Sequence, residues 1–262
     1  MEFSVAGLRV FAGSGGREFE PSLPTVALLH GAGMNHTIWA AQARALAHHG
    51  RNVVALDFPG HGASAGPPLA GIEALADWVL ACLKALGVAR FRLAGHSMGA
   101  LVALEAAARA ESSCEALALL GFVPAMRVHP DLLKAARAGE HLAAELMVNW
   151  SFGQHGLTGG NPAPGLFLPQ SALRLIEQTP AASLANDLAA CDAYRNAEAA
   201  ARRVQCPVLL LLGEDDRMTP SALGAGFAKN FSRARVRILP EAGHMMMAEQ
   251  PSLSLDSLKT IL

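Results

Sequence analysis

Short apolar runs alternate with alanine-rich stretches along most of this chain, and this alternation constrains its fold more than any other feature. The apolar runs span residues 25–29, 53–58, 91–94, 116–122, 208–212 and 236–239. Several are apolar at consecutive positions, which is typical of central parallel strands that are covered on both faces. The stretches between them are long enough to be crossover helices. The pattern therefore predicts an α/β fold with a mostly parallel, doubly wound sheet.

The segment after residue 122 interrupts the alternation. It contains helix candidates but no convincing strand before the run at residue 208, so we expect an inserted helical cap over residues 123–190. Residues 1–122 and 191–262 then form the core. The helices of the cap are expected at residues 131–138, 141–150, 169–178 and 181–192, with a loop rich in glycine and proline at 156–165.

The large apolar side chains of the predicted cap are Met126, Met147, Trp150, Phe152, Leu166 and Phe167. Most are expected to pack the cap against the core. Because a cap over the carboxyl ends of the strands covers the edge where open α/β sheets bind ligands, some should face the cleft. A substrate with an apolar portion would suit such a pocket.

Composition excludes several classes of protein. The chain is 52% apolar and 16% charged, with a net charge of −1 and no basic cluster, so it is globular and nucleic acid is not an expected partner. No apolar run reaches the roughly 18 residues of a membrane span, and no signal peptide is visible, so a cytoplasmic location is expected.

Neither a metal nor a cofactor is expected from the motifs. The four cysteines, Cys82, Cys114, Cys191 and Cys206, occur singly and are interpreted as buried thiols. The pattern Gly31-x-Gly33 is followed by His36 where a dinucleotide fingerprint needs glycine, and no phosphate-binding GxxxxGK[ST] loop occurs. The expected partner is a small-molecule substrate, and the oligomeric state is open.

The most specific motif is G-x-S-x-G, which reads Gly95-His96-Ser97-Met98-Gly99. It lies between a predicted strand and a predicted helix, which is the context of a nucleophile elbow. Such a turn forces Ser97 toward positive φ, and the two glycines let strand and helix approach without Cβ clashes. Ser97 is therefore the candidate nucleophile, although an ordinary strand-to-helix turn would also fit the bare pattern.

A serine hydroxyl becomes a good nucleophile only when a base takes its proton and a third group orients that base. Candidates follow the last two predicted strands: Asp215 and Asp216 after the first of them, and His244 after the second. If the strands are parallel, these side chains lie at the same edge of the sheet as Ser97. The order serine, aspartate, histidine also matches this type of elbow.

Five motifs in order resemble the α/β-hydrolase superfamily, in particular its capped bacterial esterases and C–C hydrolase-like members. They are His30-Gly31-Ala32-Gly33, the run from Asp57 to Ser64, the elbow, the segment from Gly213 to Pro220, and Gly243-His244 followed by Glu249-Gln250-Pro251. The resemblance covers nearly the whole chain. It implies an α/β-hydrolase fold with Ser97 as nucleophile, His244 as general base and acid, and Asp216 as the acid of the triad.

The resemblance also implies an oxyanion hole made of two backbone N–H groups, those of Ala32 and Met98. Gly33 could replace Ala32 if its loop is displaced. Asp215 is the alternative to Asp216, whose place in the register G-x-x-D-x-x-x-P favours it.

The sequence thus indicates a cofactor-independent serine hydrolase that cleaves carboxylic esters through an acyl-enzyme. Hydrolysis of a C–C bond, or a related lyase reaction, is the first alternative, because the superfamily performs it with the same triad. Thioesterase and perhydrolase activities also stay open. A ligand-binding protein that keeps the fold without turnover is the alternative from another class.

Overall fold

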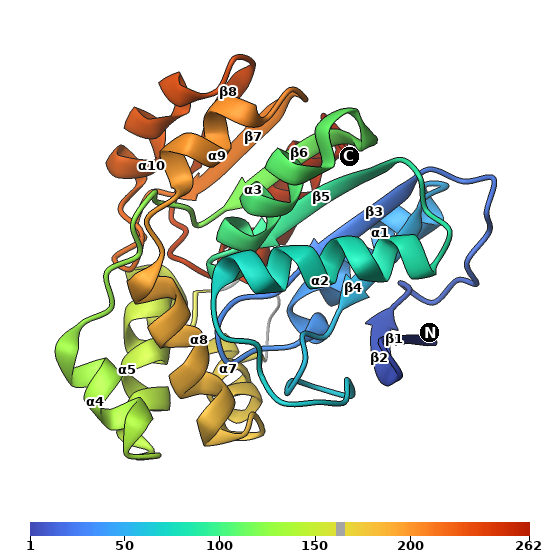
Figure 1. The fold of residues 1–262 in the computed structure, drawn as a ribbon. Coiled ribbons are helices and arrows are strands. Elements are labelled where there is room, and N and C mark those ends of the chain that lie inside the picture. Colours follow the sequence, from blue (N-terminus) through green and yellow to red (C-terminus); the bar gives the residue numbers. More distant parts are fainter. Residues whose placement is uncertain (161–165) are drawn as a thin grey trace.

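The computed structural model describes residues 1–160 and 166–262, and its centre is an eight-stranded sheet with the order β1-β2-β4-β3-β5-β6-β7-β8 (Figure 1). The strands are β1 (Glu2–Val5), β2 (Leu8–Gly13), β3 (Thr25–Leu29), β4 (Asn52–Leu56), β5 (Phe91–His96), β6 (Cys114–Leu120), β7 (Val208–Gly213) and β8 (Ala234–Leu239). The hairpin β1-β2 and the pair β2-β4 are antiparallel, and every other pair is parallel. The predicted α/β class with a mostly parallel sheet is confirmed.

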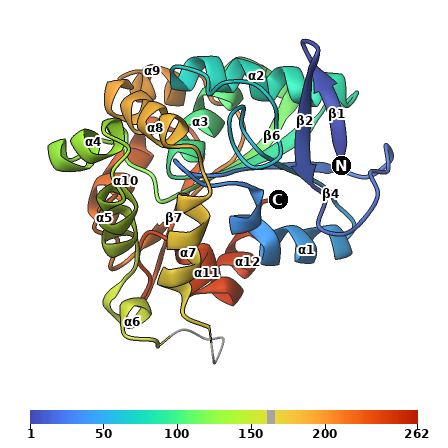
Figure 2. The same cartoon turned by 90° about the horizontal axis from the view of Figure 1, so that it is seen from below.

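Helices cover both faces of this sheet (Figure 2). One layer holds α2 (Ile72–Ala85), α3 (Met98–Ala110) and α9 (Ala197–Arg203). The other holds α1 (Ala40–His48), α11 (Met246–Glu249) and α12 (Pro251–Lys259), and α10 (Ser221–Phe227) packs against β7. Three short 3-10 helices complete the core: η1 (His36–Trp39), η2 (Glu111–Ser113) and η3 (Ala228–Asn230). Two helical layers around one sheet are the doubly wound arrangement that the alternation predicts.

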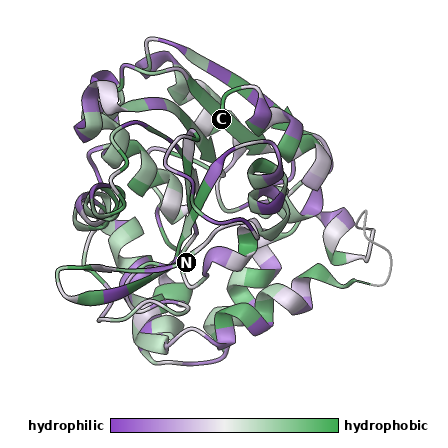
Figure 3. Ribbon diagram, turned by 90° about the vertical axis from the view of Figure 1, so that its right-hand side faces the viewer, coloured by the Kyte–Doolittle hydropathy of each residue, from purple (hydrophilic) through white to green (hydrophobic). Residues whose placement is uncertain are grey.

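The central strands form because their residues are apolar on both faces. Every residue of β3, β4 and β7 is buried, and Figure 3 shows hydrophobic residues concentrated in the sheet. Burying each leucine or valine side chain contributes about 1.5–3 kcal/mol. Ser97 and the other candidate residues therefore lie at the ends of strands whose positions are fixed by a buried apolar core.

Five helices between β6 and β7 form the predicted insertion: α4 (Pro130–Arg137), α5 (Leu142–Ser151), α6 (Gln154–Leu157), α7 (Leu168–Glu177) and α8 (Ala181–Ala193). Figure 1 shows α4, α5, α7 and α8 grouped beyond the ends of the central strands, which is the position of a cap. The limits of the cap, residues 123–190, stay a prediction.

Three helices depart from the sequence-based expectation. The helix α6 occupies the start of the predicted loop at residues 156–165, of which residues 161–165 lie outside the described part. The helices α9 and α11 are not expected from the sequence, and α9 packs against α3 in the core layer. All three are short, and a helix of one or two turns depends on tertiary packing rather than on propensity.

All four cysteines are buried free thiols, as predicted. Within residues 1–160 and 166–262, no helix combines the length and the apolar character that a membrane span requires.

Candidate active site

The nucleophile elbow has the strained geometry that its sequence predicts. Ser97 links β5 to α3 with φ of 55° and ψ of −120°. A Cβ atom on Gly95 would lie 2.0 Å from the carbonyl oxygen of Gly99, and one on Gly99 would lie 2.4 Å from the carbonyl oxygen of Leu29. A non-glycine residue in such a conformation costs about 1–3 kcal/mol, which the surrounding packing must offset. The side chain of Ser97 lines a cavity at this turn.

His244 and Asp216 meet at the carboxyl end of the sheet. The Nδ1 atom of His244 lies 2.8 Å from Oδ2 of Asp216, and both side chains are almost fully buried. Asp215, the alternative, is exposed. An ionised carboxylate can only accept, so Nδ1 carries the proton and Nε2 keeps its lone pair. That Nε2 is buried and makes no hydrogen bond to any described residue, so the Ser97 hydroxyl does not donate to it here.

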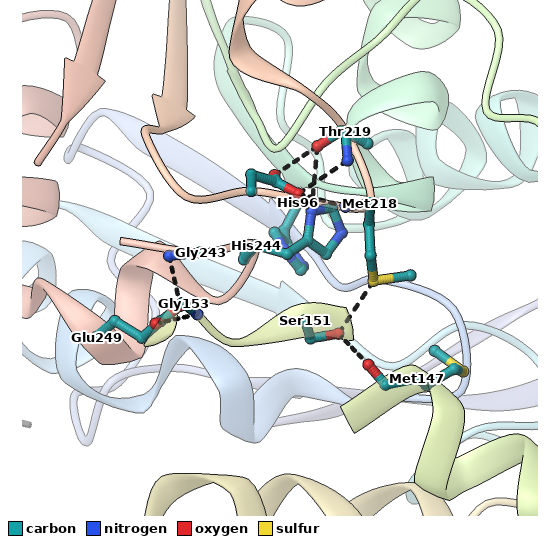
Figure 4. A network of polar contacts seen from close by, with 10 residues as sticks. His96, Met147, Ser151, Gly153, Met218, Thr219, Gly243, His244 and Glu249 are labelled. Carbon is teal, nitrogen blue, oxygen red and sulfur yellow. Dashed lines mark hydrogen bonds and ion pairs between the residues drawn. The ribbon is translucent and has the colours of Figure 1, made fainter. Parts of the chain in front are cut away.

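Asp216 is held by more donors than the histidine alone. Its Oδ1 accepts from the backbone N–H groups of Met218 at 2.9 Å and Thr219 at 2.8 Å, and its Oδ2 accepts from the Thr219 hydroxyl at 2.6 Å (Figure 4). Burial alone would raise the pKa of Asp216, but the charge of His244 and these hydrogen bonds outweigh it and lower the pKa. The sequence reasoning missed Thr219, because an aspartate that bonds the backbone two residues on signals a turn but does not mark the threonine that follows.

His96 and Gly121 shape the space around His244. The Nε2–H of His96 donates to the carbonyl oxygen of His244 at 2.9 Å, and the two rings lie 4.7 Å apart. Burial and the neighbouring His244 lower the pKa of His96 to about 3. A Cβ atom on Gly121 would lie 2.8 Å from Cε1 of His244, so this position at the end of β6 needs glycine. His96 is thus a neutral structural support for the backbone of His244.

The loop after β3 brings Ala32, one of the two proposed oxyanion donors, to the elbow, which carries the other donor, Met98. A Cβ atom on Gly31 would lie 3.2 Å from Cβ of Ser97, so this loop is in contact with the candidate nucleophile. Met98 is the first residue of α3, and its N–H has no acceptor within the helix. Neither this amide nor that of Ala32 donates a backbone hydrogen bond to another described residue. Ala32 lines the cavity, and Met98 directly follows Ser97, which also lines it, so both amides remain candidates for binding an oxygen there.

The cap holds the alternative donor, Gly33, in place. Its N–H donates to Oδ2 of Asp187 in α8 at 3.0 Å, and its carbonyl oxygen accepts from the Thr179 hydroxyl at 2.9 Å. Since this N–H is already engaged, the structure favours Ala32 over Gly33 as oxyanion donor. The sequence analysis missed Asp187 and Thr179 because they lie 154 and 146 residues from Gly33 along the chain.

The same carboxylate of Asp187 contacts His61 of the core. The Nε2 atom of His61 lies 2.8 Å from Oδ2 of Asp187, and its Nδ1 lies 3.1 Å from the carbonyl oxygen of Pro59. Burial opposes a charge on this ring, but the hydrogen bond and the charge of Asp187 prevail and raise the pKa of His61. Because both ring nitrogens face acceptors, only the imidazolium satisfies both. An ion pair between His61 and Asp187 therefore joins the core to the cap, next to the loop after β3 that carries Ala32 and Gly33.

A second set of contacts joins the cap to the loop of His244. The carbonyl oxygen of Ser151 accepts from the backbone N–H of His244 at 2.6 Å. The carboxylate of Glu249 accepts from the N–H groups of Gly153 at 2.9 Å and Gly243 at 3.0 Å (Figure 4). Ser151 and Gly153 were missed, since nothing in the sequence sets the orientation of the cap, whereas Gly243 and Glu249 belong to the fifth motif of the sequence. These contacts fix the backbone on which His244 is presented.

A cavity of about 1260 Å³ is lined by Ser97, His244, Ala32 and residues of the cap. It exceeds the about 300–1,000 Å³ usual for small-molecule sites. Of the apolar cap residues, Met126, Met147 and Trp150 line it, whereas Phe152 is buried elsewhere and Leu166 and Phe167 are about half exposed. The expectation that some of them face the cleft is confirmed. No group of three potential ligands that could hold a metal ion occurs among the described residues.

Comparisons with known proteins agree with this architecture. The chain is 25% identical over 231 residues to (E)-2-((N-methylformamido)methylene)succinate hydrolase of Acinetobacter baylyi, covering 86% of this chain and 84% of that protein. Its fold is similar to the enol-lactonase from Burkholderia xenovorans, with a TM-score of 0.88, 24% identity and coverage of 99% and 98%. It is also similar to a thermophilic esterase from Thermogutta terrifontis, with a TM-score of 0.85, 21% identity and coverage of 99% and 96%. The family model for the alpha/beta hydrolase fold matches residues 24–251, and the chain belongs to this family.

Proposed function

We propose that this protein is a serine hydrolase that cleaves carboxylic esters of small to medium, partly apolar substrates. The observation that carries the proposal is that His244, which is paired with Asp216, lines the same cavity as Ser97 at its strained elbow. The relative from Acinetobacter baylyi, which is named as a hydrolase, supports hydrolysis as the reaction class. The apolar residues Met126, Met147 and Trp150 support a substrate with an apolar portion.

In the proposed mechanism, the Ser97 hydroxyl attacks the ester carbonyl while Nε2 of His244 accepts its proton. Asp216 keeps the proton of the imidazole on Nδ1 and stabilises the imidazolium that forms. The N–H groups of Ala32 and Met98 bind the developing oxyanion, and each such donor lowers the free energy of the transition state by about 3 kcal/mol. The imidazolium then protonates the leaving alcohol.

Water completes the cycle. It attacks the acyl-enzyme with His244 again as base, releasing the acid and restoring the Ser97 hydroxyl. The open Nε2 of His244 implies that the serine moves into hydrogen-bond reach when substrate binds, since catalytic hydrogen bonds often tighten only in the complex. A carbonyl group seated against Ala32 and Met98 would supply that change.

The test compares hydrolysis of p-nitrophenyl esters by the wild type, Ser97→Ala and Asp215→Asn. Ser97→Ala should reduce kcat by at least about a thousandfold. Asp215→Asn, the matched control at the exposed neighbour of Asp216, should stay close to the wild type. Equal rates for the wild type and Ser97→Ala would refute the proposal.

Labelling with a fluorophosphonate separates an enzyme from a ligand-binding protein that shares its fold. A working triad should form a stable adduct on Ser97, identified by mass spectrometry of the peptide that contains the elbow. Asp216→Asn should slow this labelling, because the imidazole loses the group that orients it. A wild-type protein whose Ser97 stays unlabelled would support the ligand-binding alternative.

A further inference from the structure

The wall of the proposed catalytic cavity is basic. Four cationic side chains line it: Arg127, Lys134, Arg137 and Arg217. Among the described lining residues, Asp192 is the one carboxylate, so the wall has a formal excess of three positive charges. The whole chain, by contrast, has a net charge of −1.

These four cations lack counter-charges. In the part of the chain that the structure describes, none of them forms an ion pair, whereas Arg109, Arg174 and Arg202 all pair with carboxylates. The carboxylate of Asp192 is engaged by the backbone N–H of Val128 at 3.0 Å. All four side chains are exposed, and the Arg217 guanidinium also donates to the carbonyl oxygen of Asn149, so an anion in the cavity would meet hydrated positive charges that no described carboxylate pairs with.

A simple solvated helix face does not account for this arrangement. Lys134 and Arg137 lie three residues apart in the last turn of α4, where cations also favour the helix dipole. Arg127 lies before that helix, and Arg217 lies beside Asp216 on the loop after β7. Three separate segments thus direct positive charge into one cavity, whose apolar residues strengthen the field there.

We propose that this basic wall binds a carboxylate of the substrate, so that the preferred esters carry a negative charge remote from the bond that is cleaved. The inference rests on the proposed ester hydrolysis and specifies its substrate class. The guanidinium groups match a carboxylate with paired N–H donors, and the large cavity has room for a chain between that carboxylate and the ester. The apolar wall contacts the chain itself.

The test measures kcat/KM for p-nitrophenyl hydrogen adipate and for the neutral p-nitrophenyl heptanoate of similar length. Ser97→Ala gives the background rate for each ester. The variant Lys134→Gln/Arg137→Gln should lower the adipate-to-heptanoate ratio by up to about 25-fold, because each of the two exposed charge contacts contributes up to about fivefold in binding. The change should fall mainly in KM for adipate.

Arg44→Gln is the matched control, since Arg44 is an exposed arginine of α1 that is not among the residues lining the cavity. It removes one positive charge, where Lys134→Gln/Arg137→Gln removes two, and should change the ratio by less than about twofold. A second measurement needs no variant: raising the salt concentration from about 0.05 to about 0.5 M should lower the wild-type ratio by screening.

Two results would overturn the proposal. One is that Lys134→Gln/Arg137→Gln changes the adipate-to-heptanoate ratio no more than Arg44→Gln does, which would mean that the position of the charge does not matter. The other is a wild-type ratio that does not respond to salt. In both cases the esters would still be hydrolysed, so the proposed function would stand, whereas its own failure would show as turnover equal to Ser97→Ala.

Discussion

Two buried neutral histidines should make this protein lose stability in mild acid. Burial lowers the pKa of both His30 and His96 from 6.5 to about 3. His30 is satisfied as a neutral ring, because its Nδ1–H donates to the carbonyl of Gly31 and its Nε2 accepts from the N–H of Phe58. His96 has no acceptor for a second proton, since its Nδ1 makes no hydrogen bond to a described residue.

The sign and size of the effect follow from proton linkage. The unfolded chain binds a proton near pH 6.5 and the folded chain only near pH 3, so stability is complete above pH 6.5 and is lost as the pH falls. Each pH unit below 6.5 costs about 1.4 kcal/mol for each histidine. At pH 5 the loss is about 2 kcal/mol for His96 and a similar amount for His30.

The assay is urea unfolding of the wild type and His96→Gln between pH 7.5 and pH 5. The glutamine amide can still donate to the carbonyl of His244, so the variant removes the titrating ring with little loss of that bond. The wild type should lose about 2 kcal/mol more than the variant over this range. The comparison cancels the contribution of His61, whose raised pKa acts in the opposite direction.

His48→Gln is the control, because it removes an exposed imidazole that is hydrated in both states. Its unfolding free energy should follow the wild type across the range. Calorimetric or potentiometric proton uptake on unfolding at pH 5 gives an independent readout, and His96→Gln should take up one proton fewer. Parallel pH curves for the wild type and His96→Gln would refute the reasoning.

Three further outcomes are expected. Gly99→Ala should fail to fold or lose several kcal/mol, because its Cβ would overlap backbone, whereas Gly226→Ala has open space and should be neutral or stabilising by up to about 1 kcal/mol in thermal unfolding. Thr219→Val should lower kcat about tenfold with little change in KM, and an unchanged kcat would contradict its positioning role. Asp187→Asn should lower the free energy of unfolding by about 1.5–3 kcal/mol at pH 5.5 and by less at pH 9, measured by urea unfolding. The ion pair with His61 stabilises the folded chain fully below pH 6.5, and this contribution is lost as the pH rises through the raised pKa of His61. A loss of stability that does not depend on pH would contradict this reasoning.

The elbow could be predicted from sequence because its determinants are local. A strand, five residues and a helix fix the conformation of Ser97, and the two glycines leave few alternatives. The choice of Asp216 over Asp215 likewise depended on a short register, which agrees with the contact to His244. Central strands were found for the same reason, since burial on both faces leaves consecutive apolar residues.

The contacts of the cap could not be predicted in this way. Asp187 and Ser151 are ordinary polar residues of helices, and the local hydrogen bond of the Ser151 hydroxyl to the carbonyl oxygen of Met147 does not mark its contact with His244. Their importance comes from where the cap lies on the core, which depends on many side chains at once. The basic wall is similar: Arg127 and Arg217 are distant in sequence, and only the folded chain shows that they line one cavity.

The cap of this protein is attached to both halves of the proposed catalytic machinery. The carbonyl oxygen of Ser151 accepts from the backbone N–H of His244. In the loop after β3, Asp187 accepts from the N–H of Gly33, and Thr179 donates to the carbonyl oxygen of Gly33. Lifting the cap as a rigid lid would break these bonds and disturb both base and oxyanion donors, at a cost of about 1 kcal/mol or more for each buried bond. The proposed carboxylate-binding wall lines the same cavity as Ser97, so its positive charge would attract an anionic substrate toward the serine without any movement of the cap.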